Sequence, residues 1–92
     1  MKQEQAEVIA LQAVAFIGAD ERALNGLMAQ SGAGIDDLRN QINDPAFLAG
    51  VLDFLLSDES ALLAFCGDVE LAPEFVVSAR RALPGGENLW DG

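Results

Sequence analysis

The chain repeats itself when residues 6–39 are laid over residues 44–77 without a gap. The matched pairs are Phe16/Phe54, Ile17/Leu55, Asp20/Asp58, Glu21/Glu59, Ala23/Ala61, Leu24/Leu62, Leu27/Phe65, Met28/Cys66, Asp36/Glu74 and Leu38/Val76. They are core-type residues and the acids that are typical of helix starts. The repeated feature is therefore a folding unit, and no catalytic set is repeated with it.

Apolar residues recur along the chain at the spacing of helix faces, and no window alternates as a strand does. The pattern predicts helices over 5–17, 21–30, 35–42, 45–56, 59–66 and 73–83. Asp20, Asp44 and either Ser57 or Asp58 are expected to cap helix starts. Gly18-Ala19, Gly32 to Gly34 and Gly67 are expected to end helices, and Pro84-Gly85-Gly86 to end regular structure. The fold class is all-α.

The fourth predicted helix is apolar on nearly every side, which is typical of a buried helix at the centre of a fold. We expect it to pair with the first helix, in a compact bundle of five or six short helices. The bundle would be built from two three-helix repeats about a pseudo-twofold axis. The side chains expected to face inward include Val8, Leu11 and Phe16 at the margin of the first helix, Leu62, Leu63 and Phe65, and then Phe75, Val76, Ala79 and Leu83.

The chain carries more apolar residues than one small core can bury. It has 92 residues, of which 51% are hydrophobic and a further nine are Gly, against about 45–50% for all these types in ordinary soluble domains. We expect residues 1–86 to form one helical domain and residues 87–92 to form a flexible, acidic tail. The apolar surplus predicts an exposed helix face that binds protein, most simply a second copy in a homodimer.

The charge balance excludes several classes of partner. Five Lys and Arg against 15 Asp and Glu give a net charge of −10, which repels nucleic acids and anionic membrane surfaces. The apolar runs 8–17 and 46–56 are too short to span a bilayer, and the acidic leader before the first run disfavours a secretory signal. A single Cys and the lack of His fit a cytoplasmic protein without a disulfide or a histidine-based metal site.

Most carboxylates fall at predicted helix starts, where unpaired N–H groups favour negative charge. This placement explains them without a metal ion, a cofactor or a catalytic acid. Asp53, the one charge in the fourth helix, is the candidate for a buried ion pair, with Arg22 or Arg39 as partner; a buried acid with a tuned pKa is the alternative. Cys66 is expected to pack as a small apolar residue.

Two further features suggest binding. Ser60 is weakly similar in context to the attachment serine of acyl carrier proteins, although Glu59 and Ala61 replace the usual neighbours. Leu89 and Trp90 are candidate partner-binding residues in the tail, since Trp is frequent in binding hot spots. The alternative is that Trp90 packs over the domain's own apolar surface.

Five stretches resemble a family of small alphaproteobacterial proteins, domain of unknown function 3572, over residues 6–86. They are Phe16-Ile17-Gly18-Ala19-Asp20, Ile35-Asp36-Asp37-Leu38-Arg39, Asp44-Pro45-Ala46-Phe47-Leu48, Leu52-Asp53-Phe54-Leu55-Leu56 and Ala79-Arg80-Arg81-Ala82-Leu83-Pro84-Gly85-Gly86. The resemblance implies a compact helical fold in a bacterial cytoplasm. It implies no catalytic residue.

The sequence favours a non-enzymatic helical module that binds a protein partner. A small-ligand or acyl carrier protein is the first alternative, and an acidic decoy of a basic nucleic-acid-binding protein is the second. We expect no catalytic, cofactor-binding or metal-binding residues. An enzyme is the least favoured class, because carboxylates alone would have to perform the chemistry.

Overall fold

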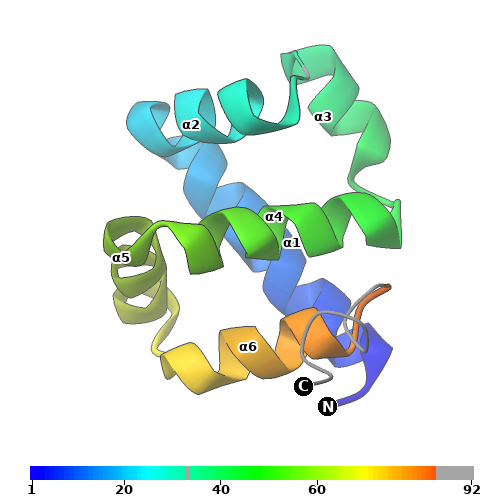
Figure 1. The fold of residues 1–92 in the computed structure, drawn as a ribbon, viewed down its shortest axis with the longest axis vertical. Helices are drawn as coiled ribbons and strands as arrows, with labels where there is room; N and C mark the ends of the chain where they lie inside the picture. Colours follow the sequence, from blue (N-terminus) through cyan, green and yellow to red (C-terminus); the bar gives the residue numbers. More distant parts are fainter. Residues whose placement is uncertain (33, 85–92) are drawn as a thin grey trace.

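The computed structural model describes residues 1–32 and 34–84, and over these residues the protein is all-α. Six helices follow one another within these residues (Figure 1). Their bounds are α1 Gln3–Ala19, α2 Glu21–Ser31, α3 Ile35–Gln41, α4 Pro45–Ser57, α5 Glu59–Val69 and α6 Pro73–Arg81. No strand occurs in this described part of the chain.

Three helices begin at the predicted aspartate caps. Asp20 accepts hydrogen bonds from the backbone N–H groups of residues 22 and 23, and Asp58 accepts one from that of residue 61. Asp44 accepts one from the N–H of residue 46, and Pro45 takes the first helical position, where no N–H is needed. Of the two alternatives for α5, Asp58 is the cap and Ser57 is the last residue of α4.

Three predicted helix ends are wrong by two or three residues, and one of them is that of α6, which ends at Arg81 and not at residue 83. Helix α1 continues through Gly18 to Ala19 and ends because Asp20 adopts an extended conformation as the cap of α2. Helix α5 continues through Gly67 to Val69 and ends at Glu70, which has a left-handed conformation with φ 56°. A glycine inside a helix lowers the stability of the helix by only about 1 kcal/mol relative to alanine. Half-buried Val69 offsets this loss by packing against the core.

Helix α4 lies at the centre of the fold, as its apolar sequence predicts. It packs against α1, α2, α5 and α6, and Figure 1 shows it crossing α1, with α2 and α6 on its opposite sides. The core is formed by buried side chains from five helices and the turn after α6. They are Ala6, Ile9, Ala10, Ala13, Ile17, Ala23, Leu27, Leu48, Ala49, Val51, Leu52, Phe54, Leu55, Phe65, Cys66, Val76, Ala79 and Leu83.

Four side chains that the sequence places inward are exposed instead: Val8 and Leu11 of α1, Leu63 of α5 and Phe75 of α6. The outer helices meet the core along a narrower face than their apolar residues cover. On α1 this face is centred on small alanines, and on α5 it contains Phe65 and Cys66. The apolar surplus is therefore located on the surface of particular helices.

The sequence repeat has a counterpart in the local structure. Helices α2 and α5 cover matching residues, and their C-terminal caps, Gly32 and Glu70, are both left-handed. The packing of the third helices differs, because α6 contacts both α1 and α4 whereas α3 packs extensively on neither over the described residues. Leu38 of α3 is buried outside the main core. The pseudo-twofold relation between the halves stays a prediction.

Candidate interaction surface

The outward side of α1 carries two of the exposed large apolar side chains in the described residues. Because Ala6, Ala13 and Ile17 turn toward the core, the opposite side carries Val8 and Leu11, which are 56% and 42% exposed. The same side continues through exposed alanines. We define the α1 face as Val8, Leu11, Ala15 and Ala19, which succeed one another at intervals of three or four residues. Residues 8–19 contain no charged side chain.

One end of the α1 face opens into a groove between α1 and α6. The groove is lined by Met1, Gln5, Val8, Ile9, Phe75 and Ser78, and we call it the α1–α6 groove. Met1 and Phe75 remain 48% and 51% exposed there. Its lining contains no acidic side chain, although the chain as a whole is strongly acidic. The sequence does not predict this groove, since its apolar pattern places Phe75 in the core.

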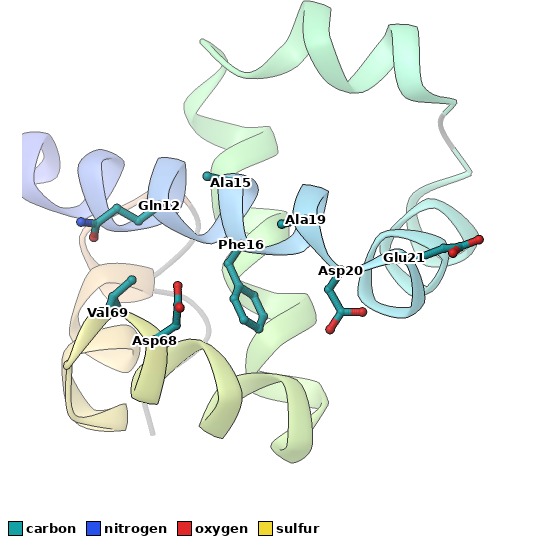
Figure 2. Close-up of a pocket in the computed structure, with 8 residues that line it drawn as sticks. All are labelled: Gln12, Ala15, Phe16, Ala19, Asp20, Glu21, Asp68 and Val69. Atoms are coloured by element: carbon teal, nitrogen blue, oxygen red, sulfur yellow. The ribbon is translucent and has the colours of Figure 1, made fainter.

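A second groove lies between the other end of α1 and α5, and it has a different character (Figure 2). Phe16 lies in it and makes an edge-to-face contact with buried Phe65, with ring centroids 5.7 Å apart. In the view of Figure 2 the Phe16 ring lies between the carboxyl groups of Asp20 and Asp68. Asp20 already accepts two backbone hydrogen bonds as a cap. This groove combines an aromatic floor with an acidic rim.

The carboxylates do not gather into a metal site within residues 1–32 and 34–84, where no three potential ligands come together. Several are used at helix starts. Besides the three aspartate caps, Asp37 accepts a hydrogen bond from the N–H of Gly34 at the start of α3. Asp68 is the penultimate residue of α5, whereas the sequence predicts it in a loop after that helix.

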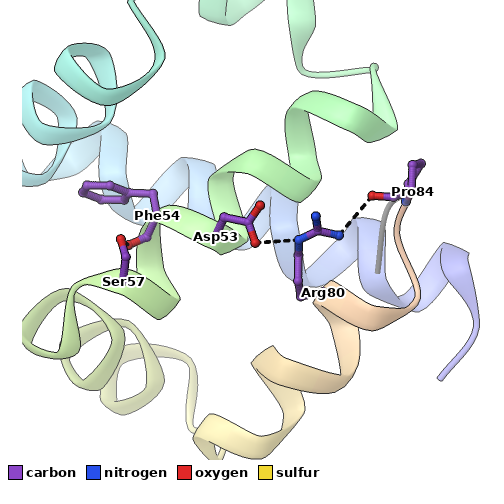
Figure 3. A network of polar contacts seen from close by, with 5 residues as sticks. All are labelled: Asp53, Phe54, Ser57, Arg80 and Pro84. Carbon is purple, nitrogen blue, oxygen red and sulfur yellow. Dashed lines mark hydrogen bonds and ion pairs between the residues drawn. The ribbon is translucent and has the colours of Figure 1, made fainter. Parts of the chain in front are cut away.

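Asp53 is joined to Arg80, so the predicted partners, Arg22 and Arg39, are wrong. The Arg80 Nε donates to Asp53 Oδ1 at 2.6 Å, and Nη1 donates to the Pro84 carbonyl at 3.0 Å (Figure 3). The Arg80 side chain is only 7% exposed, whereas that of Asp53 is 41% exposed. The arrangement ties α4 to α6 and to the turn after α6, and leaves the carboxylate at the solvent edge.

Cys66 and Ser60 have unlike surroundings. Cys66 is buried, and desolvation raises the pKa of its thiol, which disfavours the reactive thiolate. Ser60 is exposed in the first turn of α5, beside a groove that also contains Asp58 and Arg22. Neither residue forms part of a nucleophile–base pair among the hydrogen bonds of the described residues. Leu89 and Trp90 lie outside the described residues, and their role stays a prediction.

No helix in the described part of the chain is long and apolar enough to cross a membrane. Residues 3–86 match the profile of a family described as protein of unknown function (DUF3572). No curated protein and no solved structure matches the chain.

Proposed function

We propose that this chain, which belongs to that family of unknown function, is a non-enzymatic helical interaction module whose first partner is a second copy of itself. The observation that carries the proposal is the α1 face. Val8 and Leu11 are exposed on this face and are not packed into the core. Ala15 and Ala19 extend the face to the end of α1. Burying such side chains against a second helix contributes about 25 cal/mol per Å² of apolar area.

The distribution of charge favours binding of a second copy at the α1 face over binding at other faces of the protein. Each copy carries a net charge of −10, so two copies repel each other at most mutual orientations. The α1 face is free of charged residues over twelve consecutive positions, 8–19. Contact centred on Val8 and Leu11 therefore places no charged side chain of residues 8–19 in the interface, and the acidic groups of the α1–α5 groove adjoin only the far end of the face, at Ala15 and Ala19. Small side chains at Ala15 and Ala19 would allow the two helix backbones to approach closely.

The chemistry of the described side chains supports a binding role over catalysis. The sequence contains no His, and burial raises the pKa of the one thiol. The caps at Asp20, Asp44 and Asp58 use their carboxylates to hold helix starts. The cytoplasm is the proposed setting, since a single buried Cys needs no oxidising compartment.

Sedimentation velocity of the full chain over a concentration series tests the proposal. We expect a concentration-dependent dimer, which Leu11→Glu converts to monomer by placing a charge in the contact. The matched control is Leu63→Glu, which alters a similarly exposed leucine on α5 and should leave the dimer intact. A protein that is monomeric throughout the series, or a dimer that is lost only in the control variant, would rule out the α1 face as the contact.

A further inference from the structure

We propose that the α1–α6 groove is an intramolecular docking site for the acidic tail of this chain, residues 87–92, with Leu89 and Trp90 as the anchoring side chains. The groove has the composition of a small peptide-binding site. Phe75 and Met1 supply exposed apolar walls, and Gln5 and Ser78 supply polar groups between them. This proposal rests on a different observation from the dimer, although the groove and the α1 face share Val8.

The structure fixes the point from which the tail departs. Arg80 is held on one side by Asp53 and donates on the other to the carbonyl of Pro84. Leu83 is buried beside this contact. The chain is therefore anchored to α6 as far as Pro84, and the tail departs beside the helix that forms one wall of the groove.

The length of the remaining chain matches the distance that it has to cover. Phe75 lies six residues before Arg81, the last residue of α6, which corresponds to roughly 9 Å along a helix, and three further residues lead to Pro84. Trp90 lies six residues after Pro84, and an extended chain of that length reaches roughly 20 Å. Gly85 and Gly86 come first in this segment and permit the chain to reverse direction.

Charge selects this groove over the others. Glu87 and Asp91 flank the anchoring pair, so the tail is repelled by the α1–α5 groove with Asp20, Glu21 and Asp68. The α1–α6 groove has no acidic lining. A third groove, between α2 and α4, is also free of acids. Its walls are α2 and α4, whereas the chain up to Pro84 is attached to α6 and the α1–α6 groove contains two residues of that helix.

The fluorescence of Trp90 reports docking directly, because the chain contains one Trp and no Tyr. In the full chain we expect an emission maximum at shorter wavelength than that of free tryptophan, together with protection from acrylamide quenching. Phe75→Ser should return both to solvent-like values. Ser78→Glu should do the same while it keeps the Phe75 ring, since it adds a negative charge inside the groove. Circular dichroism of each variant verifies that the helices are retained.

The matched control is Leu63→Ser, at a leucine that is 53% exposed on α5, and it should leave the Trp90 spectrum unchanged. Solvent-like emission in the unaltered chain would overturn the proposal. So would a shifted emission that neither groove variant alters. Recording the spectrum in the Leu11→Glu variant and on dilution separates the two proposals: emission that stays shifted shows docking within one chain, whereas emission that reverts shows that a second copy covers Trp90.

Discussion

Arg80 of α6 and Asp53 of α4 form an ion pair in which the cation is buried and the anion reaches solvent. Arg80 also donates to the carbonyl of Pro84. One side chain therefore joins the central helix, the last helix and the turn where the described chain ends. A buried guanidinium is stable only with such partners, because an unpaired buried charge is strongly disfavoured.

The coupling between Asp53 and Arg80 is measurable in a double-mutant cycle. We expect Asp53→Asn and Arg80→Leu to show a coupling free energy of about 1–2 kcal/mol in chemical denaturation, since bonds between charged groups are strong but one partner is solvated. A parallel cycle with Arg39→Leu should give no coupling, because Arg39 lies on the surface of α3. Equal coupling in the two cycles would contradict the pairing seen here.

Phe54→Ala should lower the free energy of unfolding by about 3–5 kcal/mol, because the ring is buried within the core where α4 meets α2. Urea denaturation monitored by circular dichroism measures this change. The exposed Leu63→Ala is the reference and should stay within about 0.5 kcal/mol of the unaltered chain. A nearly neutral Phe54→Ala would mean that α4 is not the core element.

Two helical glycines should respond differently to alanine. At Gly67 an added Cβ meets nothing within 4 Å, so Gly67→Ala should stabilise the protein by about 0.5–1 kcal/mol through helix propensity. At Gly26 the Cβ would lie 3.1 Å from two carbons of the Phe54 ring. Gly26→Ala should therefore stabilise less or destabilise. Thermal melts measure the change in melting temperature for each variant. A larger increase for Gly26→Ala than for Gly67→Ala would contradict the close contact between residue 26 and the Phe54 ring.

Glu70→Gly should stabilise the protein, because Glu70 ends α5 in a left-handed conformation that costs a residue with a Cβ about 1–2 kcal/mol. Gly32 ends α2 with φ 72° and has open space around it, so Gly32→Ala should lose about as much as Glu70→Gly gains. Denaturation midpoints of both variants measure the two changes. A destabilising Glu70→Gly would indicate that its side chain makes a stabilising contact.

The sequence predicts those features that depend on neighbouring residues. Asp20, Asp44 and Asp58 signal helix starts because a capping side chain acts on N–H groups two or three positions away. The sequence of α4 predicts that this helix lies at the centre of the fold, because the helix is apolar on nearly every side. The buried positions of α1 also agree with its periodicity, with Ala6, Ala10 and Ala13 facing inward.

The features that the sequence did not reveal depend on how helices cross. Asp53 and Arg80 are 27 residues apart, and their contact exists because α6 packs against α4. Phe75 and Leu63 look like core residues by spacing, yet no helix covers them over the described residues. Gly67 resembles a helix end, although packing carries α5 two residues farther. Phe75 lines the α1–α6 groove, whereas Leu63 belongs to neither that groove nor the α1 face.

The most direct test of the central claim, that the α1 face is the contact surface, is an NMR dilution series of the uniformly ¹⁵N-labelled full chain. The account predicts concentration-dependent amide shifts centred on Val8, Leu11 and Ala15, with Leu63 and its neighbours on α5 unchanged. Shifts that are centred on α5 or α3 and spare α1 would contradict it. So would a spectrum that does not change over the whole concentration range.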